Sequence, residues 1–350
     1  MIKVLIVDDS AFMRNALTTM LSADPEITVA ATARDGLEAI EKVKTVRPDI
    51  VTMDVEMPRM DGITALRHIM EEAPVPVIMV SSLTMDGAKV TLDALDIGAV
   101  DFIPKNLSDL SVNIVKIKEL LIDKVKQLSK KGVVKRRPRP SAAAPLSAPV
   151  RSLPPVRKTG ERRIGLVAIG TSTGGPKALQ DVIPLLPKEF PVPIVIAQHM
   201  PPNFTGPFAE RLNQLSQVAV KEAVEGESLK AGVVFIAPGR GHMRVVRKGI
   251  DTVISISENK DDFIYRPSVD ALMLSVAECF PGRALGVILT GMGNDGLKGL
   301  TALKNNGGRI FAQDEDTCVV YGMPKAVVDA GIADKVMAIE EIAGEIVNAV

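Results

Sequence analysis

A serine, a histidine and an aspartate each follow an apolar stretch that predicts a buried strand. Ser172 lies in the sequence Gly-Thr-Ser-Thr-Gly, directly after one apolar run. His199 ends a second run that starts at Pro193, and Asp295 follows a third in the turn Thr-Gly-Met-Gly-Asn-Asp. The carboxyl ends of parallel strands open onto one edge of a sheet, where α/β proteins bind ligands. We therefore expect these three side chains to converge.

The surroundings of Ser172 are typical of a nucleophilic serine. Flanking glycines let a strand turn sharply into a helix, so that the hydroxyl projects and backbone N–H groups stay free to bind an oxyanion. The amides of Thr173 and Met292, both in glycine-bounded turns, are candidates for that oxyanion hole. A serine at such a turn is also a common helix N-cap, and glycine-rich turns of this kind also bind phosphate. The chain order Ser–His–Asp disfavours the α/β-hydrolase fold, whose order is Ser–Asp–His.

Three histidines occur in the chain, and His199 is the best candidate base because it follows a buried strand. His68 belongs to an amphipathic stretch and is expected at the surface of a helix. His242 is expected on a turn, either lining the cleft or exposed to solvent. The sequence therefore favours a serine hydrolase with Ser172 as nucleophile, His199 as base and Asp295 as the acid that orients it.

A second set of polar residues lies near the amino terminus. Asp8 and Asp9 follow one predicted strand and Asp54 ends another, so the three carboxylates are expected at one sheet edge. Like charges this close are unfavourable unless a cation compensates them, and their hard oxygen atoms favour Mg²⁺. Ser81 and Lys105, at the next two strand ends, supply a hydroxyl and an ammonium suited to a phosphoryl group.

Composition narrows the class of protein. The 350 residues carry 42 basic and 42 acidic side chains, so the net charge gives no argument for binding nucleic acid or a membrane surface. No apolar run approaches ~18 residues, and no membrane insertion is expected. Cys279 and Cys318 match no metal or redox spacing and are expected to be buried thiols. The amino terminus shows no leader sequence, so a cytoplasmic protein is expected.

The composition changes sharply between Lys130 and Arg163, where eleven basic residues and six prolines accompany a single acid. A segment with so few apolar side chains does not bury enough surface to fold, and we expect a flexible linker. Its positive charge either binds an acidic surface or keeps the linker solvated. The predicted organisation is a first domain at 1–128, a linker at 129–162 and a second domain at 163–350.

Apolar runs alternate with amphipathic stretches in both domains. This alternation predicts two α/β domains, each a doubly wound parallel sheet with helices on both faces, and a β-hairpin inserted in the second near Val245 and Thr252–Glu258. The expected strands are 4–7, 27–30, 50–53, 77–80 and 99–103 in the first domain, and 164–169, 193–197, 233–237, 284–289 and 309–312 in the second.

The first domain resembles a response-regulator receiver domain over about residues 1–125. The likeness rests on Val-Asp-Asp-Ser at 7–10, Met-Asp-Val-Glu-Met-Pro-Arg-Met-Asp-Gly at 53–62, Val-Ser-Ser at 80–82 and Pro-Lys at 104–105. Receivers usually read Lys-Pro at the last position, so this chain has the reverse order. The resemblance implies a (βα)5 fold in which Asp54 accepts phosphate from a histidine kinase. It also implies Mg²⁺ ligation by Asp9, Asp54 and the carbonyl of Glu56, with Asp8 acting through water, phosphoryl contacts from Ser81 and Lys105, and a rotating aromatic switch at Phe102.

The second domain resembles the catalytic domain of the CheB family, the chemotaxis protein-glutamate methylesterases. The motifs are Ile-Gly-Thr-Ser-Thr-Gly-Gly-Pro at 169–176, Gln-His-Met-Pro-Pro-Asn-Phe at 198–204, Ile-Ala-Pro-Gly at 236–239, Arg-Pro-Ser-Val-Asp at 266–270, Leu-Thr-Gly-Met-Gly-Asn-Asp-Gly at 289–296, Ala-Gln at 312–313 and Cys-Val-Val-Tyr-Gly-Met-Pro at 318–324. With the receiver in front, the resemblance covers nearly the whole chain. The family usually has histidine where this chain has Tyr265.

The resemblance implies a Rossmann-like esterase, activated by phosphorylation, that hydrolyses glutamyl methyl esters of chemoreceptors and deamidates glutamines by the same route. The implied partners are methylated chemoreceptors as substrate and a chemotaxis histidine kinase as phosphodonor, and the esterase step needs no cofactor. Two other functions stay open: a paralogous methylesterase that serves a signalling array other than chemotaxis, and a receiver joined to a non-catalytic binding module. The second domain lacks a basic recognition helix, which disfavours the latter.

Overall fold

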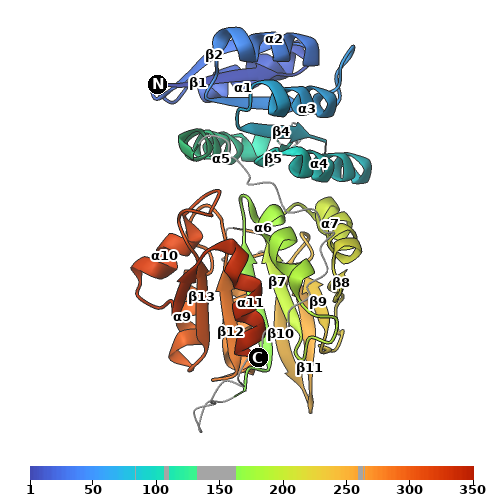
Figure 1. The fold of residues 1–350 in the computed structure, drawn as a ribbon, viewed down its shortest axis with the longest axis vertical. Helices are drawn as coiled ribbons and strands as arrows, with labels where there is room; N and C mark the ends of the chain where they lie inside the picture. Colours follow the sequence, from blue (N-terminus) through green and yellow to red (C-terminus); the bar gives the residue numbers. More distant parts are fainter. Residues whose placement is uncertain (83, 106–109, 132–162, 259–262, 264) are drawn as a thin grey trace, which may run out of the picture.

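The computed structural model describes residues 1–82, 84–105, 110–131, 163–258, 263 and 265–350, with only the backbone for 110–117 and 131. The predicted linker at 129–162 lies outside the described residues, apart from its first three positions, which continue the preceding helix. Figure 1 shows two α/β units, one of residues 1–131 and one of residues 163–350, in contact with each other. No helix in the described ranges is long and apolar enough to cross a bilayer.

The first unit is built on a five-stranded parallel sheet with the strand order β2-β1-β3-β4-β5. Helices α1 and α5 contact each other on one face, and α2, α3 and α4 contact one another in sequence on the other. The strands are β1 (Ile2–Val7), β2 (Ile27–Ala33), β3 (Ile50–Asp54), β4 (Val77–Ser81) and β5 (Asp101–Pro104); the helices are α1 (Ala11–Leu21), α2 (Gly36–Val46), α3 (Gly62–Glu72), α4 (Met85–Ile97) and α5 (Leu110–Lys131).

Side-chain caps fix where the helices of this unit begin. Ser10, Asp35, Asp61 and Thr84 each accept a hydrogen bond from the amide three residues later. The inner strands β3 and β4 are buried at every position, as expected for parallel strands covered on both faces. Polar side chains at their carboxyl ends are therefore held on a rigid edge.

The second unit contains a seven-stranded sheet with the strand order β14-β13-β12-β6-β7-β9-β8, in which every neighbouring pair is parallel. Its strands are β6 (Leu166–Thr171), β7 (Ile194–Gln198), β8 (Ala219–Glu222), β9 (Val233–Ile236), β12 (Ala284–Ile288), β13 (Arg309–Gln313) and β14 (Lys335–Met337). Strands β10 (His242–Lys248) and β11 (Asp251–Ser257) form a separate antiparallel hairpin. The helices are α6 (Gly175–Val182), α7 (Pro202–Leu215), α8 (Val269–Cys279), α9 (Leu297–Asn305), α10 (Met323–Asp329) and α11 (Ile339–Ala349).

Helices cover both faces of this larger sheet. On one face α6 contacts α7 and α11, and on the other α9 contacts α8 and α10, while the hairpin packs on α8 through β10. The buried apolar side chains of the α6 face and of the α2–α4 face of the first unit belong to one continuous cluster. The two units therefore share apolar contacts.

The predicted fold class is confirmed, with two additions and one correction. The sheet of the second unit has two strands beyond the five expected, the short β8 and β14. His242, expected on a turn facing the cleft or solvent, is instead the first residue of β10 and is fully buried. Its Nδ1 lies 3.2 Å from the amide of Ser268 and accepts its hydrogen, which explains how a polar ring is accommodated there. His68 is about half exposed on α3, as expected.

Candidate functional site

The three strand-end residues of the second unit come from neighbouring strands. Strands β12, β6 and β7 lie side by side, and Asp295, Ser172 and His199 follow their respective carboxyl ends. The Nδ1 atom of His199 lies 3.1 Å from Ser172 Oγ, and its Nε2 atom lies 2.7 Å from Asp295 Oδ2. The structure thus brings the three side chains into one hydrogen-bonded row.

The turn after β6 places Ser172 against the loop that follows β12. The Ser172 amide donates to the carbonyl of Thr290 at 3.0 Å. Gly174 has a φ of 76°, a left-handed conformation that glycine adopts without strain. A Cβ atom on Gly175 would lie 2.0 Å from Gln198 Oε1 and 2.4 Å from Thr171 Oγ1, so a larger residue would displace these buried side chains. These two glycines are therefore required by conformation and by packing.

The hydrogen bonds of His199 select one tautomer of its ring. An ionised carboxylate only accepts hydrogen bonds, so Nε2, which faces Asp295, carries the ring proton. Nδ1 then has a lone pair directed at the hydroxyl of Ser172. This is the arrangement that a general base needs before it takes a proton from a nucleophile.

Asp295 is buried at the amino terminus of α8 and accepts four hydrogen bonds. Besides His199, the donors are the Ser268 hydroxyl at 3.0 Å, the Val269 amide at 2.7 Å and the Asp270 amide at 3.0 Å. Burial acts to raise the pKa of Asp295, but the hydrogen bond and charge of His199 and the backbone donors outweigh it, and the pKa lies below its usual value. Asp295 therefore stays ionised beside His199.

Helices α8 and α9 each receive a capping carboxylate from a residue in, or just before, the other helix. Asp295 lies just before α9 and caps α8, whereas Asp270 lies in the first turn of α8 and caps α9. The Asp270 Oδ1 atom accepts from the amides of Gly296 at 3.0 Å and Gly299 at 2.7 Å. Burial and the nearby charge of Asp295 raise the pKa of Asp270, although the two amides oppose the shift. This exchange fixes the turn that carries Asp295 relative to the segment that holds it.

Gln198 ties the turn of Ser172 to the loop of His199. Its Nε2 atom donates to the carbonyl of Ser172 at 3.0 Å and to the carbonyl of His199 at 2.9 Å. The side chain is buried at the end of β7, so these bonds are shielded from water. Gln198 thereby helps to set the spacing of the two loops that carry Ser172 and His199.

The two predicted oxyanion-hole amides lie in turns beside Ser172. Thr173 is the next residue, and the turn of Met292 is packed so tightly that a Cβ atom on Gly291 would lie 2.9 Å from Ser172 Cβ. Within the described ranges, neither the Thr173 nor the Met292 amide donates to a backbone carbonyl. Both amides therefore stay candidates for the oxyanion hole.

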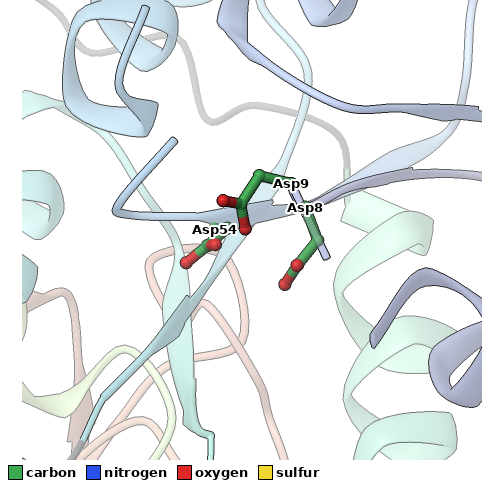
Figure 2. A group of neighbouring side chains, drawn as sticks. All are labelled: Asp8, Asp9 and Asp54. Carbon is green, nitrogen blue, oxygen red and sulfur yellow. The ribbon is translucent and has the colours of Figure 1, made fainter. Parts of the chain in front are cut away.

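The predicted carboxylate cluster of the first unit is assembled at the ends of β1 and β3. Figure 2 shows Asp8, Asp9 and Asp54 grouped together, and one oxygen of each lies within 4.8 Å of the others. Asp8 and Asp54 are buried, whereas Asp9 is exposed. The amide of Glu56 donates to Asp54 Oδ1 at 3.4 Å. The cluster thus places several hard oxygen donors at the same edge of the sheet.

Lys105 supplies the positive charge next to this cluster. Its Nζ atom lies 2.5 Å from Asp54 Oδ2 and 3.2 Å from Asp8 Oδ2. Burial raises the pKa of Asp54 to about 6; Lys105 opposes this shift, and the charge of Asp8 adds to it. The reversed Pro-Lys order therefore still delivers the ammonium to the predicted phosphoacceptor.

Two further residues predicted to act with Asp54 lie on the neighbouring strands. Ser81 is fully buried at the end of β4 and accepts a hydrogen bond from the Thr91 hydroxyl at 2.6 Å. Phe102, on β5, is buried against the second unit and stacks on Phe204 of α7, with ring centroids 4.6 Å apart and planes 7° apart.

The contact between the two units involves α4, β5 and α5 of the first unit, which face the second unit in Figure 1. Arg211 of α7 pairs with Asp93 at 2.6 Å and with Asp96, both on α4. Lys124 of α5 pairs with Asp101, and its Nζ atom also lies 3.5 Å from Thr173 Oγ1, next to Ser172. In addition, Met292, Val319 and Val320 pack into the apolar cluster between α1, α5 and the first sheet.

Sequence reasoning gave no role to Gln198, Ser268 or Asp270. All three lie within motifs that carried the family resemblance, at 198–204 and 266–270. That resemblance was the one available signal, because a strand-end glutamine and a helix N-cap serine are common in proteins without any site. Cys318 is buried and Cys279 partly buried, and both are free thiols.

Family models match both units of the chain. The CheB methylesterase family model matches residues 167–346, and the response regulator receiver domain model matches residues 4–114. The chain is 52% identical, over 100% of both chains, to protein-glutamate methylesterase/protein-glutamine glutaminase 1 of Oleidesulfovibrio alaskensis. It is also 52% identical to protein-glutamate methylesterase/protein-glutamine glutaminase 2 of Nitratidesulfovibrio vulgaris, over 99% of each chain.

A solved structure extends the likeness to the fold of the second unit. The CheB methylesterase catalytic domain of Thermotoga maritima is 43% identical and matches with a TM-score of 0.53, covering 54% of this chain and all of that one. The sequence relatives span the full length, the receiver model matches the first unit and the catalytic domain matches the second. The chain therefore belongs to the CheB methylesterase family and carries a response regulator receiver domain at its amino-terminal end.

Proposed function

We propose that the chain is a phosphorylation-activated protein-glutamate methylesterase and protein-glutamine glutaminase that acts on chemoreceptors in sensory adaptation. The observation that carries the proposal is the hydrogen-bonded row Ser172–His199–Asp295 at the carboxyl edge of the sheet. The names of the full-length relatives support the reaction and the substrate class.

The proposed reaction starts with attack of Ser172 Oγ on the ester carbonyl of a glutamyl methyl ester. His199 Nδ1 takes the hydroxyl proton, and the amides of Thr173 and Met292 stabilise the oxyanion. The bond between the carbonyl carbon and the methoxy oxygen then breaks. The proton passes from His199 to that oxygen, and methanol departs. The glutamyl group is then bound to Ser172 Oγ as an ester, the acyl-enzyme.

Hydrolysis of this acyl-enzyme completes the cycle. Water gives one proton to His199 and attacks the acyl carbon, the bond to Ser172 Oγ breaks, and the proton returns to the serine. A glutamine side chain follows the same steps with ammonia as the leaving group. Throughout, Asp295 holds the imidazole in the required tautomer, and the steps use no cofactor.

We further propose that Asp54 is the phosphoacceptor and that a histidine kinase supplies the phosphoryl group. Asp8, Asp9 and Asp54 place three carboxylates within 4.8 Å, and one ammonium, from Lys105, lies beside them. This excess of negative charge and the all-oxygen donors fit Mg²⁺. Asp9, Asp54 and the Glu56 carbonyl would hold the ion, Asp8 would act through water, and the ion would offset the charge of the incoming phosphoryl group.

The resting state is proposed to be autoinhibited by the receiver. Lys124 of the receiver contacts Thr173, and Met292 packs into the apolar cluster between α1, α5 and the first sheet. Both contacts support the proposal that the receiver blocks access to Ser172. Phosphorylation would draw Ser81 and Lys105 toward the phosphoryl oxygens, and rotation of Phe102 would remove its stack on Phe204. Because the units are covalently tethered, even weak contacts keep the site mostly closed.

The direct test is methanol release from receptor-containing membranes that carry radiolabelled methyl esters. The full-length protein is expected to release methanol slowly, and faster when Mg²⁺ and a small phosphodonor such as acetyl phosphate are added. Folded Ser172→Ala is expected to release none above background. If wild-type protein releases no methanol with the phosphodonor present, the proposed activity is wrong; if Ser172→Ala keeps it, the serine mechanism is wrong.

A further inference from the structure

Tyr265 lies flat against the imidazole of the proposed base. The rings of Tyr265 and His199 have centroids 4.4 Å apart and planes 11° apart. Tyr265 lies three residues before Ser268, whose hydroxyl donates a hydrogen bond to Asp295. One short segment therefore contacts both the base and the acid that orients it.

The two hydrogen bonds of His199 do not fix its ring completely. Both run from ring nitrogens, to Ser172 and to Asp295, and lie along the edge of the ring. Such in-plane hydrogen bonds only weakly resist a tilt of the ring out of its plane. A flat aromatic surface on one face removes this motion, because any swing toward that face meets the phenol ring.

We propose that Tyr265 is a positioning residue that holds the His199 ring in the plane of Ser172 and Asp295 and stabilises the imidazolium formed during catalysis. The inference rests on the serine mechanism proposed above. An aromatic face attracts a cation, and His199 gains a positive charge when it takes the serine proton. The contact is thus stronger in the transition state than in the resting enzyme, which is the condition for raising kcat.

The surroundings of Tyr265 favour the ring rather than the hydroxyl as the active part. Tyr265 is partly buried, and burial together with the charges of Asp295 and Asp123 raises the pKa of Tyr265, so the phenol stays neutral near neutral pH. A Cβ atom on Gly293 would lie 3.3 Å from the Tyr265 hydroxyl, so the hydroxyl sits against the turn that carries Met292. Phenylalanine would keep the ring and lose this contact.

The kinetic test compares Tyr265→Phe and Tyr265→Leu in the full-length protein with Mg²⁺ and phosphodonor, by methanol release. We expect Tyr265→Phe to keep kcat within about twofold. Tyr265→Leu should lose about tenfold in kcat, equivalent to about 1.4 kcal/mol, with KM changed less than twofold. Phe263→Leu is the matched control, because Phe263 belongs to the same segment but its ring packs on His242 instead. It should leave kcat unchanged.

A spectroscopic arm tests the stack without substrate. The chain has three histidines, so protein labelled at the Cε1 carbon of histidine gives three resonances, and the His199 signal is assigned by its loss in His199→Gln. The tyrosine ring should shift the His199 Cε1 proton upfield in wild type and in Tyr265→Phe. The shift should vanish in Tyr265→Leu and persist in Phe263→Leu.

The outcomes separate this inference from the proposed function. An upfield shift in wild-type protein that releases no methanol would support the stack while the proposed activity fails. Tyr265→Leu with wild-type kcat, or a wild-type His199 resonance without the upfield shift, would overturn the inference alone. Equal losses in Tyr265→Phe and Tyr265→Leu would also overturn it, because the hydroxyl and not the ring face would then be responsible.

Discussion

Removing Arg211 should partly release the esterase from its receiver. The side chain lies on α7, is about one quarter exposed, and pairs with Asp93 and Asp96 on α4. Each pair is partly screened by water, so each is worth about 0.5 to 0.75 kcal/mol and both together about 1 to 1.5 kcal/mol. If the two ion pairs form only in the closed state, Arg211→Ala shifts the closed–open equilibrium about five- to tenfold toward the open form.

The assay is the initial rate of methanol release by unphosphorylated full-length protein at low ionic strength. Arg211→Ala should raise this resting rate about five- to tenfold and leave the fully phosphorylated rate unchanged. Raising the salt concentration should increase the wild-type rate more than the variant's, because salt screens the same ion pairs. The matched control is Lys304→Ala, which breaks a similarly exposed pair with Asp334 at the far end of α9.

Two results would refute this reasoning. A resting rate equal to that of wild type would show that the pairs with Asp93 and Asp96 do not hold the closed state. An equal rise in the resting and the phosphorylated rates would show that Arg211 affects catalysis itself. Restoration of the low resting rate in a charge-swapped protein, with Arg211→Asp combined with Asp93→Arg and Asp96→Arg, would strengthen the assignment beyond what a single substitution shows.

The other predictions concern the two sites and the tether. His199→Ala should lower kcat by several orders of magnitude and Asp295→Asn by a similar or smaller factor, measured on folded protein by methanol release; near-normal turnover of either would remove that residue from the mechanism. Asp54→Asn should abolish stimulation by phosphodonor and Mg²⁺ without lowering the resting rate, and stimulation equal to wild type would mean that another residue accepts the phosphate. Because burial raises the pKa of Asp54 to about 6 from 3.8, the folded protein gains stability from the protonated carboxyl below about pH 4 and loses it as the pH rises through 6. In metal-free buffer at pH 7.5, Asp54→Asn should therefore raise the unfolding free energy by up to about 3 kcal/mol, and the gain should disappear near pH 4; a gain that is independent of pH would contradict this assignment. Residues 160–350 alone should be faster than the resting full-length protein and insensitive to phosphodonor, whereas a folded fragment that is no faster would indicate that the receiver activates by direct contact.

The strand pattern predicts the fold well because most strands are inner strands. A run such as Val77–Val80 is buried on both faces and is continuously apolar, which gives a clear signal. The strands that were missed, Ala219–Glu222 and Lys335–Met337, lie at the two sheet edges. They are short and largely exposed or polar, so their pairing depends on neighbours that are distant in sequence.

The same contrast holds for the sites. The meeting of Ser172, His199 and Asp295 follows from a rule about parallel sheets, namely that strand ends share an edge. The stack of Tyr265 on His199 follows from no such rule, because it joins two loops 66 positions apart and depends on their path after the strands end. His242 illustrates the converse. A histidine after Pro-Gly-Arg-Gly is predicted to lie on a turn, lining the cleft or exposed, until its buried partner at Ser268 is known.

The hydrogen bonds of Asp295 also decide how the stability of this protein responds to mutation. Catalytic groups often cost a protein stability, so their removal makes it more robust while abolishing activity. Here the acid also accepts hydrogen bonds from the amides at the start of α8. Without the carboxylate, Ser268 and Val269 would keep buried donors without acceptors. Selection for a stable fold and selection for turnover therefore act on this position in the same direction, and a drifting lineage that abandons the reaction would still be held to an acceptor at residue 295.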